Sequence, residues 1–476
     1  MGENARIVSF ENMITGVETK MRKPIRFYAS VLGAKCMIGL MRLMGRNATN
    51  LPGEIALYFF PNLLRYFEMP KTVIAVTGTN GKTTTSNMIN TILRENGYDF
   101  IDNSFGGNVD TGIASILLSN CTLGGKFKKD LALFEMDERS APRLLPYLAP
   151  DYLVCTNLQR DSMKRNAHTE FIFNILNENI PAKTKLILNG DDLISSRLAE
   201  QNSRVYFGLD KLEGEIPTED NIICDMKNCP KCGRPITYTF RHYNHIGRGY
   251  CEHCGFASPA IDFEAKSVSD GVVTILHDGK EEHYSLPNNR ITDIYNTTAA
   301  VTLARTFGLS EEQVAAAVKK MEVVKSRYDR FEAAGCEVLV TLAKGQNPVA
   351  CSAMCDFIRK EPGKKAVIMI LDDANDARNS TENVAWIYET DFEFLKGDDI
   401  KQIVIGGVRC RDYLVRCLVA GIDREKVACT PNEAEVPGLL RLDEIDKILI
   451  LYDVFNGPAL KNICDQLKAL PTGGNA

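Results

Sequence analysis

The sequence of 476 residues contains no long uncharged apolar run, no internal repeat and no low-complexity tract. A membrane-spanning helix needs about 18 to 20 consecutive apolar residues, so none is predicted. The closest approach is residues 27–45, where Lys35 and Arg42 interrupt an apolar helical pattern. We predict a buried N-terminal helix there, and a helix that rests on a bilayer surface stays open as the alternative.

The chain also lacks an excess of positive charge. Its formal net charge is −5, so it has no overall attraction for phosphate backbones, and nucleic-acid binding would have to be local. The first residues, MGENARIVSF, do not form a basic-then-apolar leader, and the 15 cysteines are scattered over a long chain. We therefore expect a cytoplasmic protein with free thiols and one metal site.

Short apolar strands alternate with helical segments from Thr72 onward. This pattern predicts an α/β protein with parallel sheets and functional groups at the carboxyl ends of the strands. A β-like run is expected at 268–286, a helical stretch at 293–322, and a second doubly wound unit from about residue 330. The predicted strands are 72–76, 131–135, 152–156, 185–189, 365–373, 402–407 and 447–453.

The most informative motif is VIAVTGTNGKTTT, a strand that runs into a glycine-rich turn and then a helix ending at Gly97. Glycines let backbone N–H groups face phosphate oxygens, and the helix N-terminus favours the anion. We expect Lys82 to reach the β- and γ-phosphates and Thr83 to offer its hydroxyl to Mg²⁺. Val76 stands where the common pattern has its first glycine, so the loop is a shortened variant. The predicted nucleotide-binding residues of the motif are Gly78, Thr79, Asn80, Gly81, Lys82, Thr83 and Thr84.

Four cysteines form two Cys-x-x-Cys pairs that enclose 18 residues: Cys229, Cys232, Cys251 and Cys254. Four thiolates at this spacing predict a closed tetrahedral Zn²⁺ site of structural type, and Cys224 is a spare thiol outside it. The stretch is rich in arginine and in tyrosine, so a zinc-ribbon ATPase that binds nucleic acid is one hypothesis. The other, which we favour because the chain is acidic, is a structural insertion at about 221–258 whose basic residues form a solvated face.

TGTNGKTTT resembles the signature of the Mur ligase family, and other segments resemble its MurT branch, the ligase subunits of lipid II isoglutaminyl synthase. The segments are LPGEIALYFFPNLLRYF, NSFGGNVDTGIASILL, LALFEMDERSAPRLLPYLAPDYLVCTNLQRDSM, the four-cysteine stretch, IYNTTAAVTLA, SRYDRFE, LAKGQNP and GGVRCRDYLVRCLVAGID. The resemblance implies a P-loop Mur-ligase central domain with an inserted zinc ribbon, and a C-terminal Rossmann-like α/β domain. The implied boundaries are 1–69 for a short helical segment, 70–324 for the ATP-binding domain and 325–476 for the C-terminal domain.

The resemblance also implies roles for individual residues. Lys82, Glu135 and Asp161 would be catalytic, with Glu135 as a Mg²⁺ ligand beside Thr83. Asn157 and Asp161 would be polar groups of the metal or substrate site, while Asp137 and Glu138 would be solvated or orienting groups. Three further residues would meet the nucleotide, at the adenine, at the domain hinge and at phosphate respectively: Asn296, Arg327 and Lys344.

The implied activity is ATP-dependent amidation of the D-glutamate α-carboxylate in the stem peptide of lipid II, through an acyl phosphate. The sequence carries no glutaminase nucleophile of its own, so ammonia would come from a separate GatD-type subunit in a heterodimer. The implied location is the cytoplasm, at the inner face of the membrane that holds lipid II. A Mur-type ligase that adds an amino acid is the alternative enzyme, and a non-catalytic scaffold is a further one.

Several positions depart from the family pattern. No lysine occurs between Asn166 and Ala182, so a second metal supported by a carbamylated lysine is not expected. Lys164 stands where a carboxylate is usual, and Ser326 replaces the glycine before the hinge arginine. Relatives have an aspartate that assists the partner glutaminase where this chain has Asn383, and the nearby acids that could substitute are Asp372, Asp373 and Asp376.

Overall fold

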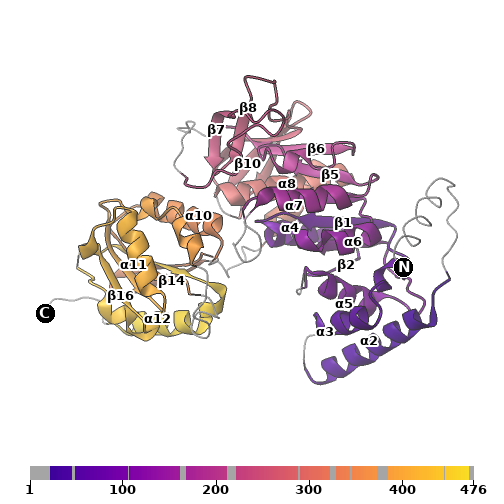
Figure 1. The fold of residues 1–476 in the computed structure, drawn as a ribbon, viewed down its shortest axis with the longest axis horizontal. Coiled ribbons are helices and arrows are strands. Elements are labelled where there is room, and N and C mark those ends of the chain that lie inside the picture. Colours follow the sequence, from indigo (N-terminus) through magenta and orange to yellow (C-terminus); the bar gives the residue numbers. More distant parts are fainter. Residues whose placement is uncertain are drawn as a thin grey trace. The chain divides into compact units, whose positions relative to one another are not determined.

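The structure is a computed structural model, and it describes residues 22–45, 49–104, 107–160, 168–211, 221–287, 290–321, 328–343, 346–372, 384–443 and 445–470. The chain divides into two compact units: Met1–Val73 with Phe100–Ala132, and Ile74–Asp99 with Leu133–Ala476. Figure 1 labels their elements. The domain boundaries 1–69, 70–324 and 325–476 stay a prediction. None of the helices in the described ranges combines the length and the apolar character that crossing a bilayer requires.

The first unit is mainly helical. Gly53 lets two of its helices approach closely: its N–H donates to Ser115 Oγ at 2.8 Å, and a Cβ there would lie 1.9 Å from the carbonyl oxygen of Thr111. The N-terminal helix predicted at 27–45 is present as α2, but only one of its faces is buried. The elements of this unit are α2 (Ile25–Leu43), α3 (Leu51–Phe59), η1 (Leu63–Tyr66), β2 (Phe100–Asp102) and α5 (Asp110–Asn120).

The second unit contains two sheets. In the larger one, β1, β4, β5 and β6 pair in parallel in that order, and β9 continues parallel to β6 before β10 and β11 add antiparallel strands. β3 lies on the other side of β1. The strands are β1 (Thr72–Thr77), β3 (Leu131–Glu135), β4 (Tyr152–Cys155), β5 (Lys185–Asn189), β6 (Arg204–Leu209), β9 (Phe263–Ser269), β10 (Val272–His277) and β11 (Lys280–Ser285).

Helices pack around this sheet, and most of the expected elements are confirmed. The strands predicted at 72–76, 131–135, 152–156 and 185–189 are β1, β3, β4 and β5. The stretch 293–322 is two helices rather than one, because Gly308 ends the first with a φ of 109° and a capping box at Ser310 starts the second. The helices are α4 (Lys82–Glu95), η2 (Glu138–Ser140), α6 (Ala141–Leu148), α7 (Thr169–Asn179), η3 (Ser195–Arg197), α8 (Ile291–Phe307) and α9 (Glu311–Lys319).

The four-cysteine insertion adds a two-stranded antiparallel hairpin of β7 (Thr237–Tyr243) and β8 (Ile246–Tyr250). The turn of the hairpin lies at Asn244, which has a φ of 47°, and His245. A bridge from Asp192 to Ile246 joins this turn to the segment that follows β5. The turn is called the ribbon tip below.

The C-terminal part carries a six-stranded sheet in the order β12-β13-β17-β14-β15-β16, in which β12 is an antiparallel edge strand. The strands predicted at 365–373, 402–407 and 447–453 are β14, β15 and β17, whereas β12, β13 and β16 were not predicted. The elements are β12 (Tyr328–Ala333), β13 (Cys336–Leu342), α10 (Pro348–Lys360), β14 (Lys365–Ile370), η5 (Ala385–Tyr388), η6 (Phe392–Leu395), β15 (Ile400–Gly406), α11 (Cys410–Val419), η7 (Arg424–Lys426), β16 (Val427–Thr430), η8 (Glu433–Leu439), β17 (Lys447–Tyr452), η9 (Val454–Asn456) and α12 (Gly457–Ala469).

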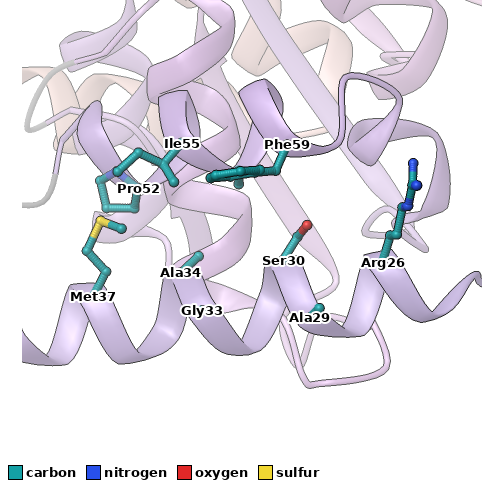
Figure 2. A pocket seen from close by; sticks show the side chains of 10 residues that line it. Arg26, Ala29, Ser30, Gly33, Ala34, Met37, Pro52, Ile55 and Phe59 are labelled. Carbon is teal, nitrogen blue, oxygen red and sulfur yellow. The ribbon is translucent and has the colours of Figure 1, made fainter.

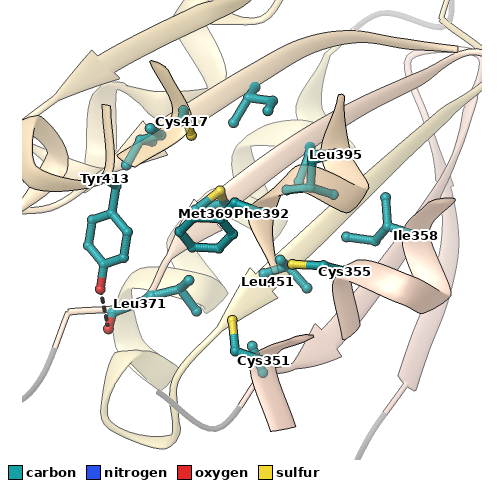
Figure 3. Close-up of a cluster of buried hydrophobic side chains, with 14 of the residues drawn as sticks. Cys351, Cys355, Ile358, Met369, Leu371, Phe392, Leu395, Tyr413, Cys417 and Leu451 are labelled. Carbon is teal, nitrogen blue, oxygen red and sulfur yellow. Dashed lines mark hydrogen bonds between the residues drawn. The ribbon is translucent and has the colours of Figure 1, made fainter. Parts of the chain in front are cut away.

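Both faces of this sheet are covered by apolar side chains. On one face, α10 and α11 contribute a core that includes several cysteines (Figure 3), and α12 packs on the other face. Tyr413 lies within the first core and donates its hydroxyl to the carbonyl oxygen of Leu371 at 3.1 Å. Parallel sheets buried on both faces give continuous apolar strands, which is why β14, β15 and β17 are readable from the sequence.

Candidate functional site

The glycine-rich turn between β1 and α4 is built as a phosphate-binding loop. Gly78 and Gly81 have φ values of 126° and 85°, a region that side chains other than glycine rarely adopt. A Cβ at Gly78 would lie 2.2 Å from Thr156 Oγ1, and one at Gly81 would lie 2.2 Å from Asn296 Oδ1. The loop is therefore held in one conformation by glycine geometry and by close neighbours. It leads directly into the N-terminus of α4, where helix N–H groups favour an anion.

A second loop, residues 156–159 after β4, supports the phosphate loop through hydrogen bonds. Asn157 accepts from Asn80 N–H through Oδ1 at 3.1 Å and donates from Nδ2 to the Asn80 carbonyl oxygen at 3.0 Å. Gln159 N–H donates to Thr79 Oγ1 at 3.0 Å, and its carbonyl oxygen accepts from the same hydroxyl at 3.1 Å. We call residues 156–159 the support loop.

The support loop changes the interpretation of Asn157. We expected this residue in the metal or substrate site, but its side-chain amide binds the backbone of the phosphate loop instead. Gln159 has a comparable part, because its Oε1 accepts from Asn80 Nδ2 at 2.9 Å. Gln159 was not predicted from the sequence, where its only signal is its position just after a buried strand.

The charged residues of the site lie at the ends of β1 and β3. Lys82 Nζ lies 3.1 Å from Glu138 Oε1 and also donates to the carbonyl oxygen of Gly78. Thr83 Oγ1 donates to Glu135 Oε1 at 3.1 Å. Lys82, Thr83 and Glu135, predicted separately, are therefore brought together. A hydroxyl and a carboxylate at this distance are hard oxygen donors that fit Mg²⁺.

Of the two alternatives expected for Glu138, a solvated or an orienting group, its place beside Lys82 fits the second. Asp137 and Glu138 are both buried, so they are not solvated groups, and Glu138 orients Lys82. Burial would lower the pKa of Lys82, but the charges of Glu138, Asp137 and Glu135 raise it, so the lysine keeps its charge. Burial raises the pKa of Glu138 in spite of Lys82.

Asn296, on α8, lies against the phosphate loop. It is buried, and its Oδ1 accepts from Thr85 Oγ1 at 3.3 Å. An adenine contact by this residue stays a prediction, as do the roles given to three residues outside the described ranges: Asp161, Arg327 and Lys344.

The four predicted zinc ligands converge. The Sγ atoms of Cys229, Cys232, Cys251 and Cys254 all lie within 4.8 Å of one another, and two pairs are 3.5 Å apart. Tetrahedral zinc with Zn–S bonds of about 2.3 Å separates its sulfurs by about 3.8 Å, so the cluster fits this ion. Burial opposes ionisation of Cys229, but backbone N–H groups of Lys231 and Cys232 lower its pKa to about 7. Four thiolates would complete a tetrahedral ligand shell and would leave no position for catalysis.

Comparison with known proteins identifies the family. Residues 76–226 match the Mur ligase middle domain, and residues 344–452 match the MurT ligase C-terminal domain. The chain is 32% identical over 403 residues, 84% of its length and 89% of the relative's, to "Lipid II isoglutaminyl synthase (glutamine-hydrolyzing) subunit MurT" of Staphylococcus aureus. It is 30% identical, over 83% of its length and 87% of the relative's, to the protein of the same name from Streptococcus pneumoniae.

The chain belongs to the MurT branch of the Mur ligase family. It is accordingly the synthetase subunit of an ATP-dependent ligase of peptidoglycan biosynthesis. Solved structures show the same α/β fold. One is a pseudomurein peptide ligase type C from Methanothermus fervidus, with a TM-score of 0.67 at 19% identity, covering 86% of this chain and 81% of that one. Another is MurF ligase from Thermotoga maritima in complex with ADP, with a TM-score of 0.56 at 16% identity, covering 87% and 84%.

In this MurT-type ligase the ribbon tip reaches the support loop. Asp192, fully buried after β5, accepts from Leu158 N–H at 2.7 Å and from Ile194 N–H at 2.9 Å. The same carboxylate lies 3.2 Å from Nε2 of His245, which is also fully buried. Asp225 lies near the start of the insertion, before β7, and accepts a hydrogen bond from Arg160 N–H at 3.0 Å. The insertion is therefore linked to the support loop through Asp192, and it contacts Arg160, the residue after the loop, through Asp225.

The basic residues of the insertion are only partly a solvated face, which corrects the prediction. Arg248 Nε lies 2.7 Å from the fully buried Asp191, and its guanidinium also reaches the carbonyl oxygen of Pro259 at 2.9 Å. The guanidinium of Arg241 lies over the ring of Tyr238. These arginines fasten the lobe instead of facing solvent together.

The aromatic side chains of the insertion are likewise occupied within it. Phe240 is buried, and Tyr238 donates its hydroxyl to the carbonyl oxygen of Met226 at 3.0 Å. Burial raises the pKa of Tyr243 well above its usual value, and only Tyr250 of the four aromatics is more than a third exposed. A stacking platform for bases requires exposed rings, so this arrangement favours the structural interpretation of the ribbon.

One of the acids considered for the glutaminase contact is described. Asp372 follows β14, is buried, and accepts from Arg409 N–H at 3.2 Å. A Cβ at Gly407, whose φ is 121°, would lie 2.4 Å from its carboxylate, so the acid is closely enclosed. Asp373, Asp376 and Asn383 lie outside the described residues, and so do Lys164 and Ser326.

Proposed function

We propose that this chain amidates the α-carboxylate of the D-glutamate residue in the stem peptide of lipid II, which yields D-isoglutamine. The observation that carries the proposal is the group formed by Lys82, Thr83 and Glu135 in a chain that is 32% identical to a lipid II isoglutaminyl synthase subunit over 84% of its length. Lys82, Thr83 and Glu135 provide the positive charge and the metal ligands that phosphoryl transfer needs. The name of the relative indicates lipid II as the acceptor.

The reaction has two steps. An oxygen of the α-carboxylate attacks the γ-phosphorus of ATP, ADP leaves, and an acyl phosphate forms. Ammonia then attacks the acyl carbon, phosphate leaves with the bonding electron pair, and the new amide nitrogen loses a proton. Lys82 balances the charge of the phosphoryl group in transfer, while N–H groups of the phosphate loop that do not bind the support loop, and those of the first turn of α4, bind the remaining phosphates.

The oxygen donors at the start of α4 and at the end of β3 fit a hard cation. Thr83 and Glu135 would hold Mg²⁺, which when bound neutralises phosphate charge. Asn296, Arg327 and Lys344 are proposed to meet the nucleotide, and Asp161 the substrate or metal. The four cysteines would hold Zn²⁺ with a purely structural part.

Ammonia is proposed to come from a separate glutaminase subunit of the GatD type, in a heterodimer. The two relatives are each named as a subunit of a glutamine-hydrolyzing synthase, which supports this. A lipid-linked acceptor further supports a cytoplasmic protein that works at the inner face of the membrane.

The test is reconstitution. The purified chain is incubated with detergent-solubilised lipid II, ATP, Mg²⁺ and an ammonium salt, and the product is analysed by mass spectrometry, with Lys82→Met as the inactive control. We expect conversion of one carboxylate to a carboxamide, and the glutaminase plus glutamine should replace the ammonium salt. Unchanged stem peptide in the presence of an active glutaminase would refute the proposal. Phosphate release driven by a free amino acid instead of ammonia would establish the amino-acid ligase.

A further inference from the structure

Helix α2 is apolar on the face that it exposes as well as on the face that it buries. Its buried positions are Phe27, Val31, Ala34 and Ile38. The opposite positions include Ile25 at 85% exposure, Leu32 at 54%, Leu40 at 57% and Leu43 at 87%. A helix with apolar side chains on both faces is ordinarily buried on both, so the outer face of α2 is expected to contact a partner molecule or a membrane.

Helix α3 extends this apolar surface within the same unit. Tyr58 and Phe59 at its end are 80% and 71% exposed. Between the two helices lies an open groove of about 610 Å³, with Gly33, Met37, Pro52 and Phe59 among its lining residues (Figure 2). Arg26 stands at one end of the groove. We call the exposed apolar side chains of α2 and α3 the α2–α3 face.

The charge on α2 has one sign, and the first acid that follows it is Glu54, in the first turn of α3. The sequence from residue 22 to residue 53 contains no aspartate or glutamate, in a chain whose net charge is −5. Arg22, Arg26 and Arg42 are exposed. The bases of this stretch are Arg22, Lys23, Arg26, Lys35, Arg42 and Arg46.

We propose that the α2–α3 face rests on the surface of a bilayer that contains anionic phospholipid. The apolar side chains enter the boundary between headgroups and acyl chains, the arginines meet lipid phosphates, and Tyr58 lies at headgroup level, where aromatic rings with a polar end collect. A second copy of the chain is a poorer occupant, because a two-fold interface would bring these bases together with no acid from the same stretch to pair with them.

The inference deepens the proposed function, since an enzyme with a lipid-linked substrate has to meet it at the membrane. The two are tested separately. Vesicle binding requires no ATP and no turnover, while amidation of detergent-solubilised lipid II requires no bilayer. Loss of one result leaves the other standing.

The experiment is flotation of the full chain with vesicles of phosphatidylglycerol and, separately, of phosphatidylcholine. Leu40→Ser with Leu43→Ser removes apolar contact, and Arg26→Glu with Arg42→Glu reverses the charge. Val419→Ser is the matched control, because Val419 is 65% exposed on α11, away from this face in the sequence. All three variants change exposed side chains, and circular dichroism checks that each is folded.

We expect binding to phosphatidylglycerol vesicles that weakens as salt is raised, and little binding to phosphatidylcholine. The serine variant should bind about tenfold more weakly and the charge-reversal variant should lose salt-sensitive binding, whereas the control should match the wild type. Failure of the wild type to float, or equal flotation of all variants, would overturn the proposal. So would light scattering that shows a dimer dispersed by the serine variant, because the face would then be occupied by a second copy.

Discussion

Replacing His245 with alanine tests how strongly the ribbon tip holds the support loop. The Asp192 carboxylate is fully buried and is shared by Leu158 N–H at 2.7 Å, Ile194 N–H at 2.9 Å and His245 Nε2 at 3.2 Å. Removing one partner of a buried ion pair costs about 3 kcal/mol or more, because the remaining charge stays in a site of low dielectric. If that loss falls on local opening, hydrogen-exchange protection should drop roughly a hundredfold.

Hydrogen exchange read by mass spectrometry measures the effect where it is expected, in peptides that cover residues 153–160 and 76–83. His245→Gln is the conservative variant, since its side-chain amide can donate to Asp192, and it should keep most of the protection. His283→Ala is the matched control, because His283 is exposed on β11. A loss of protection in His245→Ala that is spread evenly over the chain, or is absent from 153–160, would refute the reasoning.

The pH dependence of the same difference gives a second check. Burial would lower the pKa of His245, but the hydrogen bond and charge of Asp192 outweigh it and raise the pKa. Burial would raise the pKa of Asp192, but His245 and Leu158 N–H lower it. The histidine's contribution is therefore complete below its unfolded pKa of about 6.5 and is lost as pH rises through the raised folded value. The aspartate's contribution to stability is present above its unfolded pKa of about 3.8 and is lost as pH falls through its lowered folded pKa. The difference in protection between wild type and His245→Ala should therefore be largest between these two limits and should shrink in alkali.

Three further predictions concern the loop, the lysine and the metal. Lys82→Met should lower ATP-dependent phosphate release by at least about a hundredfold. Adding Glu138→Gln to this variant should restore thermal stability, because it removes the buried carboxylate that has lost its partner. Activity should not return, and its recovery would contradict the prediction. Gly81→Ala should raise the KM for ATP, because its Cβ would lie 2.2 Å from Asn296 Oδ1 on α8. Gly97→Ala is the control, since Gly97 has a similar φ and nothing within 4 Å of an added Cβ. It should lose only about 1 kcal/mol of stability and keep the KM of the wild type. Cys229→Ser should reduce bound zinc measured by plasma emission and speed hydrogen exchange in β7 and β8; full zinc occupancy would argue against four thiolate ligands.

Local chemistry explains which parts could be predicted from sequence. β1, β3, β4 and β5 are buried on both sides, so they read as short continuous apolar runs that end in polar residues. The turn at Gly78 to Gly81 carries its own signal, since glycine, lysine and threonine are required at neighbouring positions. Each Cys-x-x-Cys pair does too, because two cysteines three positions apart can bind the same metal ion. In each case the information lies within a few residues of the feature.

The features that escaped prediction depend on residues distant in the chain. Glu138 meets Lys82 across 56 positions, and His245 meets Asp192 across 53, and neither pairing leaves a periodic trace. The edge strand β12, with sequence YDRFEA, has three charged residues among six and no regular alternation, so it resembles a loop as much as a strand. The outer face of α2 was misjudged for the opposite reason. Its composition is that of a buried helix, and only the fold shows that one side lacks a protein partner among the described residues.

The insertion connects the four-cysteine cluster to the phosphate loop through a short series of contacts. Cys251 directly follows β8, and β8 begins at Ile246, next to His245 in the ribbon tip. From there the contacts run through Asp192 to the support loop, whose amides bind Thr79 and Asn80. With zinc bound as proposed, the four thiolates would offer no chemistry to the reaction. They would fix the end of a hairpin whose other end carries a buried charge pair beside the phosphate loop. A hairpin stabilised in this way would resist local opening better than two strands alone, since an isolated hairpin is marginally stable in water. Arg241, Arg248 and most of the aromatic rings of the ribbon pack within this lobe, where they stiffen the hairpin, while Arg234 and Tyr250 stay exposed.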